Sequence, residues 1–232
     1  MHANPESPEL DVEPAGAGAP IGSKQVMGHP IGLFVLFFTE MWERFCYYGM
    51  RALLRYYLLT AAFTNRHAGG VLGHEQIARF LEKIHGPLDD KGVASEVQGL
   101  YVALTYATPV IGGYIADRFI GQRRSVVVGA LVMASGEFLL MKGSWFYPAI
   151  LLLIIGNGFF KPNISTQVGA LYKEGDQRRD RAFSIFYVGI NIGAFIAPFI
   201  CGYLGEKVSW SWGFGSAGVG LLVGLVIYLG GS

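Results

Sequence analysis

The chain has 232 residues, of which 52% are apolar and 15% charged, and its mean hydropathy is +0.38. Soluble domains carry about 25% charged residues, so this composition indicates a membrane protein. The formal net charge of +1 argues against nucleic acid as a partner.

The chain divides into a tail and one domain. Residues 1–27 are rich in Ala, Gly, Pro and Glu and have few large apolar side chains, so we predict a disordered tail. Residues 28–232 are expected to form an all-α membrane protein, a bundle of six transmembrane helices, because most hydrophobic segments are near the ~20 residues that cross a bilayer core. The predicted helices lie at approximately 31–60, 95–116, 125–141, 147–170, 182–204 and 212–231.

The short loops set the orientation of these helices. Residues 117–124 hold three arginines, and residues 173–181 hold one lysine and three arginines. The short loops on the opposite side hold only Lys142 and Lys207. Because basic short loops remain in the cytoplasm, we expect both termini there.

The long loop 61–94 is then expected outside the cell. Its apolar residues repeat at 3,4,7 spacing, which predicts a short amphipathic helix on the outer membrane surface. The repeating residues are Ile77, Phe80, Leu81 and Ile84.

The first predicted helix carries five charges in a stretch otherwise made of Phe, Leu, Met, Trp and Tyr. A charge at the centre of a membrane helix costs roughly 2.5–3.5 kcal/mol on insertion scales, so such residues are usually functional. At about 100° per residue, the charges and two tyrosines share one face of about 140°, which we expect to line a water-filled cavity. The alternative is that the first three charges neutralise each other as a packing device. The face consists of Glu40, Glu43, Arg44, Tyr47, Tyr48, Arg51 and Arg55.

Lys161, near the middle of the fourth predicted helix, needs a carboxylate partner or must lose its proton. At 1.5 Å per residue, Glu40 lies about 14 Å into the ~30 Å core, and Lys161 reaches a similar depth. We therefore predict a contact between Lys161 and Glu40 or Glu43 in one conformational state, with Arg44 taking the carboxylate in the other. Glu137 on the third helix is a competing partner, which we interpret as a packing or helix-end residue.

Other reactive residues give little sign of catalysis. Cys46 and Cys201 each lie in an apolar span and are expected to pack as free thiols. All five histidines lie outside the predicted membrane interiors, so protons must be carried mainly by carboxylates. Because the charged face holds no nucleophile–base pair or metal-ligand cluster, we expect no enzyme, no metal and no cofactor, with protons as the coupling ion.

Four segments resemble a known family. TEMWERFCYYGMR is similar to the ExxER signature of proton-dependent oligopeptide transporters, a branch of the major facilitator superfamily. TYATPVIGGYIADRFIGQRR resembles that family's second helix, GNGFFKPNIS its fourth and FSIFYVGINIGAFIAP its fifth. The four motifs occur in the family's order, and the resemblance covers about residues 28–232.

The resemblance implies roles for matching residues. Arginines can hold a peptide carboxylate and tyrosines can form amphipathic walls, although simple interhelical hydrogen bonding is an alternative for Tyr106 and Asn191. The loop between the second and third helices would be a cytoplasmic gate, although topology alone also explains its arginines. The implied sets are, for proton coupling, Glu40, Glu43, Arg44 and Lys161; for peptide binding, Arg44, Tyr47, Tyr48, Arg51, Tyr106 and Asn191; and for the gate, Gly113, Asp117, Arg118, Gly121, Arg123 and Arg124.

The resemblance implies a proton-coupled symporter of di- and tripeptides in the plasma membrane. Family members have twelve core helices, and substrate binds between two six-helix halves near the midplane. We therefore expect this chain to be the N-terminal half, either as a fragment or as a half-size protein that pairs with another chain. The alternatives are a carrier of another small solute, such as nitrate, and a membrane-embedded interaction subunit that transports nothing.

Overall fold

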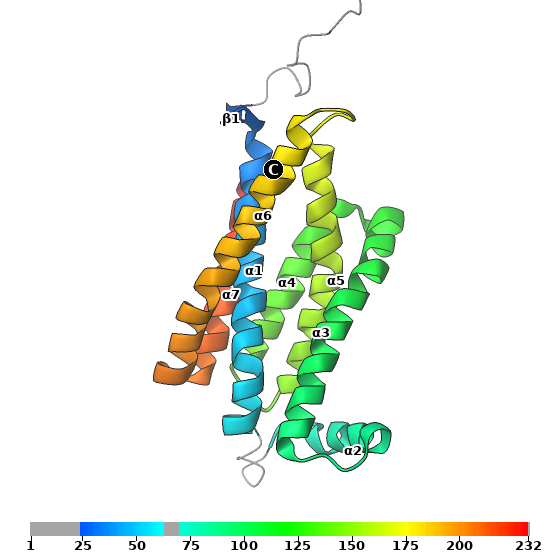
Figure 1. The fold of residues 1–232 in the computed structure, drawn as a ribbon, viewed down its shortest axis with the longest axis vertical. Coiled ribbons are helices and arrows are strands. Elements are labelled where there is room, and N and C mark those ends of the chain that lie inside the picture. The colour runs from blue at the N-terminus through cyan, green and yellow to red at the C-terminus, as the bar shows by residue number, and fades with distance from the viewer. Residues whose placement is uncertain (1–23, 63–69, 232) are drawn as a thin grey trace, which may run out of the picture.

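The computed structural model describes residues 24–62 and 70–231, in which six long helices lie side by side in a bundle (Figure 1). The predicted six-helix fold is confirmed. The long helices are α1 (Ile31–Tyr57), α3 (Asp90–Ile115), α4 (Gln122–Leu140), α5 (Phe146–Ala170), α6 (Arg178–Ala197) and α7 (Trp210–Gly230). Helices spanning 90–120, 146–170, 178–208 and 210–230 are long and apolar enough to cross a membrane.

The ends of the helices differ from the predicted boundaries by a few residues, for local reasons. Helix α3 begins five residues before the predicted position because the Asp89 side chain accepts a hydrogen bond from the backbone N–H of Gly92 and caps the helix. The Ser209 side chain caps α7 in the same way, accepting from the N–H of Trp212. Three helices continue into π-helical turns at their carboxyl ends. Helix α1 continues into η1 (Leu58–Ala62), α3 into η2 (Ala116–Ile120), and α6 into η3 (Pro198–Gly202) and η4 (Leu204–Val208).

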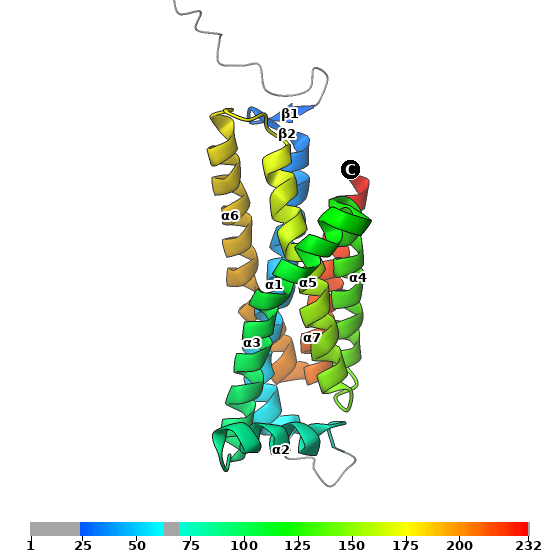
Figure 2. The ribbon, with the colours of Figure 1, turned by 90° about the vertical axis from the view of Figure 1, so that its right-hand side faces the viewer.

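A short helix crosses one end of the bundle. Helix α2 (His74–His85) lies between α1 and α3 in the sequence and runs crosswise to the long helices (Figure 2). This confirms a helix in the long loop. Of the predicted apolar face, Leu81 is buried, whereas Phe80 and Ile84 remain exposed.

The long helices pack as an open arc. Helix α1 packs against α6 and α7, α4 packs against α5 and α7, and α3 packs against α5. The two ends of this arc are therefore α3 and α6. Their most apolar stretches are 22% and 28% buried, compared with 56% for α5 and α7. One long face of the bundle, formed by α3 and α6, is thus not covered by other described residues of the chain.

Glycines allow the closest helix contacts. A Cβ on Gly112 of α3 would lie 2.1 Å from the carbonyl oxygen of Gly158 on α5. A Cβ on Gly193 of α6 would lie 2.2 Å from the carbonyl oxygen of Met41 on α1. Backbone atoms cannot move aside as a flexible side chain can, so these positions require glycine for close approach.

The described residues begin at Lys24, inside the stretch predicted as a tail; residues 1–23 of that stretch lie outside them. Strands β1 (Gln25–Val26) and β2 (His29–Pro30) form a small antiparallel hairpin directly before α1. The hairpin and the end of α7 lie at the same end of the bundle (Figure 1).

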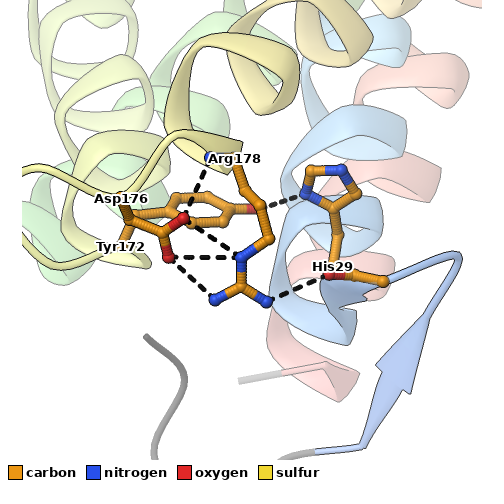
Figure 3. Close-up of polar contacts among 5 residues, drawn as sticks. His29, Tyr172, Asp176 and Arg178 are labelled. Carbon is orange, nitrogen blue, oxygen red and sulfur yellow. Dashed lines mark hydrogen bonds and ion pairs between the residues drawn. The ribbon is translucent and has the colours of Figure 1, made fainter. Parts of the chain in front are cut away.

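The hairpin is fastened to the loop between α5 and α6 (Figure 3). His29 Nδ1 lies 2.8 Å from the Tyr172 hydroxyl, and Arg178 donates a hydrogen bond to the carbonyl of Gly28 at 3.2 Å. Asp176 holds the Arg178 guanidinium, with Nη2 2.8 Å from Oδ2. Burial, together with the nearby positive charge of Arg178, lowers the pKa of His29 and so favours the neutral imidazole.

The close contact between α3 and α5 generates a prediction about stability. Gly112→Ala should destabilise the protein by about 1–3 kcal/mol, because the added methyl overlaps the backbone of Gly158. Gly99→Ala is the matched control on the same helix, since a Cβ there meets nothing within 4 Å. Denaturant titration of the two purified variants in detergent would measure their free energies of unfolding. Equal stability of the two variants would contradict the close packing of α3 on α5.

Candidate functional site

The centre of the site is one arginine between two carboxylates on α1. Arg44 Nε lies 3.2 Å from Glu40 Oε1 and also forms an ion pair with Glu43 Oε2. The three residues are at most 5% exposed. The spacing of four residues places Glu40 one helical turn from Arg44, where such side chains meet. Glu43 is the residue directly before Arg44, and its carboxylate reaches the same guanidinium. The three charges therefore lie together, as their shared helix face predicts, and in this conformation they neutralise each other, as in the alternative interpretation.

The neighbouring helix α5 contributes to the cluster through an amide. Asn157 Nδ2 donates a hydrogen bond to Glu43 Oε1 at 3.2 Å, from a side chain that is 2% exposed. Sequence analysis did not select Asn157 as a site residue. The available signal was its position one turn before Lys161, which places two polar side chains on one face of an apolar helix.

The cluster keeps unused hydrogen-bonding capacity. Within the described part of the chain, Arg44 Nη2 and Glu40 Oε2 are buried and have no hydrogen-bond partner. The Arg44 guanidinium also lies 5.0 Å from the centre of the Tyr47 ring, a distance at which cation–π attraction operates. A guanidinium with a free edge can still bind a second anion.

Lys161 occupies a different position from the one predicted for the paired state. Its Nζ lies 4.3 Å from the centre of the Tyr106 ring, so lysine on α5 and tyrosine on α3 form a cation–π contact. Among the ion pairs of residues 24–62 and 70–231, none involves Lys161. The conformation seen here corresponds to the predicted state in which Arg44 holds the carboxylates. The predicted contact of Lys161 with a carboxylate in another state stays a prediction.

The residues of the α1 face do not share one environment. Tyr47 is buried and stacks on Tyr101 of α3 with ring centres 6.2 Å apart. Tyr48 is half-buried, whereas Arg51 and Arg55 are exposed. We expected the whole face to line one water-filled cavity; instead, its first half is packed inside the bundle and its last turns are open. The reason is that neutralised charges can be enclosed, whereas unpaired arginines must remain solvated.

The remaining predicted peptide-site residues lie on the open face of the arc. Tyr106 on α3 is 59% exposed. Asn191 on α6 is exposed, and its amide donates to the carbonyl oxygen of Tyr187 in its own helix at 2.9 Å. Among the hydrogen bonds between described residues, neither makes the interhelical bond that was the alternative interpretation.

The predicted gate residues extend from the end of α3, through η2 and the turn at Gly121, into the first turn of α4. Gly121 adopts φ +84°, a left-handed conformation that favours glycine, and this ends η2 and begins α4. Gly113 faces Pro162 of α5 at ordinary contact distance. Asp117, Arg118, Arg123 and Arg124 are exposed. In the part of the chain that the structure describes, no ion pair involves Asp117, and the gate role of this segment stays a prediction.

Glu137 and the cysteines also have defined places. Glu137 lies in the last turn of α4, fully buried, and accepts a hydrogen bond from the Cys46 thiol, with Sγ 3.2 Å from Oε1. It therefore does not compete for Lys161 in this conformation. Both cysteines are free and buried. The described residues contain no group of three or more His, Cys, Asp or Glu side chains placed to hold a metal ion.

Comparison with known proteins supports the resemblance noted in the sequence. A model of the POT family matches residues 123–232. The chain is 44% identical over 212 residues to the uncharacterized transporter YclF of Bacillus subtilis, covering 90% of this chain and 39% of that protein. It is 40% identical over 208 residues to a di-/tripeptide transporter of Lactococcus lactis, covering 88% of this chain and 38% of that protein.

A solved structure has the same fold. A crystal structure of a variant of the peptide transporter POT in complex with alafosfalin matches with a TM-score of 0.75 and 41% identity, covering 90% of this chain and 39% of that chain. The chain thus spans about two fifths of the length of the relatives it matches.

The arginine–carboxylate cluster yields a second prediction. Arg44→Met should destabilise the protein by about 3–5 kcal/mol, because it leaves Glu40 and Glu43 as buried charges without a cation. Combining it with Glu40→Gln and Glu43→Gln should restore most of the lost stability, since no buried charge then remains. Thermal unfolding in detergent would compare these variants with Arg55→Met, an exposed arginine on the same helix. If Arg44→Met is as stable as Arg55→Met, Arg44 does not compensate buried charges on Glu40 and Glu43.

Proposed function

Because the chain belongs to the POT family, we propose that it forms half of a carrier that couples the uptake of di- and tripeptides to protons. The observation that carries this proposal is the buried Arg44 between Glu40 and Glu43, with part of its guanidinium left without a partner. One charged group is thereby shared between a proton-binding site and a possible anion-binding site.

The cluster couples the two ligands by competition for Arg44. Two carboxylates near one guanidinium carry a net negative charge, and a proton added to either one removes half of the attraction that holds Arg44. Arg44 is then free to bind the carboxylate of a peptide as a bidentate partner. Loss of the proton restores the internal pairs and releases the peptide. Glu40, Glu43 and Arg44 thus form the proton switch, and the coupling needs no cofactor other than the proton and no chemical change in the peptide.

Lys161 completes the switch. A lysine at this depth is costly without compensation, and here the ring of Tyr106 compensates its charge only in part. When Arg44 leaves the carboxylates for the peptide, Lys161 is the remaining cation near them. It takes the ionised carboxylate in that state, and the cation–π contact with Tyr106 is exchanged for an ion pair.

The peptide lies on the open face next to this switch. Arg44 and Arg51 hold its carboxylate, while Tyr48 and Tyr106 form walls with hydroxyl groups at their tips. The buried Tyr47 contributes from behind, through the contact of its ring with Arg44. The exposed amide of Asn191 on α6 serves the peptide backbone from the opposite end of the arc.

A second six-helix half covers the α3–α6 face. Apolar side chains alone could face lipid, but this face also presents polar groups at membrane depth, namely Tyr106, Lys161, Tyr187 and Asn191. Lipid tails cannot satisfy such groups, so they require a protein partner and an aqueous cavity. The basic loops at residues 117–124 and 173–181 support a location of that end of the bundle, with both termini, at the cytoplasmic side of the plasma membrane.

The experiment for this function compares two transport activities of the complete carrier in liposomes. Lys161→Ala should reduce proton-driven accumulation of a dipeptide to the background level, because the carboxylates lose the cation that replaces Arg44. Exchange of labelled for unlabelled dipeptide without a proton gradient should continue, since Arg44 and the peptide site are intact.

Lys173→Ala is the control, because this lysine is exposed in the loop between α5 and α6. Full gradient-driven accumulation by Lys161→Ala would show that the lysine is structural. If the unaltered carrier accumulates another small solute and no peptide, the peptide assignment itself is wrong.

A further inference from the structure

Glu137 is a buried carboxyl group for which the proposed transport mechanism has no role. It is 0% exposed, and one oxygen accepts a hydrogen bond from the Cys46 thiol. The other oxygen, Oε2, has no partner among the described residues. A buried carboxyl oxygen without a partner is costly, so its surroundings need an explanation.

The groups that face Glu137 favour its neutral form. The Cys46 thiol of α1 contacts it directly, and Glu43 and Tyr47 of α1 and Tyr101 of α3 line the same cavity as Glu137. Asn157 of α5, an uncharged residue, lines the cavity as well. The Cys201 thiol of η3 interacts with Glu137 electrostatically, and α7 packs Gly218 against it. This set contains a second carboxyl group and no cation.

The position of Glu137 in its helix also favours the neutral form of its carboxyl group. Glu137 lies in the last turn of α4, which ends at Leu140. The free carbonyl groups at a helix carboxyl end carry partial negative charge and disfavour a nearby carboxylate. A proton on Glu137 removes this repulsion, together with the repulsion from Glu43.

A small cavity joins Glu137 to the proton switch. Its volume is about 10 Å³, which is room for the centre of about one water molecule. Glu43, Cys46, Tyr47, Tyr101, Glu137 and Asn157 line it. Three of these residues have a buried polar atom without a partner in the described structure: Glu137 Oε2, the Tyr47 hydroxyl and Asn157 Oδ1. Three such atoms around one cavity are what a bound water requires.

We propose that Glu137 is a second proton-binding group of this bundle and exchanges its proton with Glu43 through one water molecule in this cavity. The Glu137 hydroxyl gives its proton to the water oxygen while the water gives one of its own protons to the Glu43 carboxylate. Glu137 ends as a carboxylate, Glu43 ends neutral, and the water is regenerated. The net charge of the two carboxyl groups stays at minus one, while its position moves away from Arg44.

The exchange deepens the proposed function, because its use in transport rests on the role of Glu43 in proton coupling. A proton stored on Glu137 can neutralise Glu43 and release Arg44 without a new proton entering from solution. Detection of the proton on Glu137 needs no substrate, so failure of peptide transport and failure of this proposal are separate results.

Infrared difference spectroscopy of the full 232-residue chain in phosphatidylcholine vesicles tests the proposal. Spectra recorded across a pH series report the carbonyl band of protonated carboxyl groups. We expect Glu137→Gln to lose one such band that the unaltered chain shows. The exposed Glu206→Gln is the control and should keep it. In Glu43→Gln, the same band should disappear at a lower pH, because Glu137 no longer faces a negative neighbour.

A band that Glu137→Gln leaves unchanged would overturn the proposal. A Glu137 band that titrates at the same pH with and without Glu43→Gln would also overturn it, since Glu137 is then a neutral packing residue without exchange. Cys46→Ala provides a test that retains Glu137 should the Gln variant not fold. Loss of the thiol hydrogen bond should shift the frequency of the Glu137 band, and an unshifted band contradicts the assignment.

Discussion

The charge on Arg44 must be neutralised inside an apolar bundle, and the rest of the site depends on how this is done. Two carboxylates of the same helix surround the guanidinium, and an amide from α5 holds one of them. Removing either the arginine or the carboxylates leaves the opposite charge buried and uncompensated, so replacement of one member alone destabilises the protein. A proton is the smallest ligand that changes this balance reversibly, which makes the cluster suited to sense protons.

The packing of the helices places this cluster where it can act. The arc runs from α3 to α6 and encloses the carboxylates, while its open face presents Lys161 and Tyr106. Close glycine contacts fix α3 on α5 and α6 on α1, so these pairs can move as rigid units. A partner covering the open face would therefore form the second wall of a cavity next to a charge cluster that already exists in the first half.

Hydrophobic segments, helix order and the clustering of the α1 charges followed from the sequence, because long apolar runs and a 100° helical period determine them directly. Other features depend on contacts between distant segments. The hydrogen bond from Asn157 to Glu43, the thiol of Cys46 on Glu137 and the resting place of Lys161 on Tyr106 each join two helices. Residue spacing within one helix gives the facing direction of a side chain, but it does not identify the residue opposite. The hairpin before α1 was not predicted, because strands of two residues are too short to produce a periodic pattern in the sequence.

The most direct test of the central claim is a measurement of proton movement caused by peptide. Liposomes that contain the complete carrier and an enclosed pH-sensitive dye would receive a dipeptide outside, with no pH gradient imposed. The account predicts that the interior acidifies as peptide enters, and that Glu43→Gln still exchanges peptide but no longer acidifies the interior. Equal acidification by the Glu43→Gln carrier would contradict the claim that the carboxylates around Arg44 carry the coupled proton.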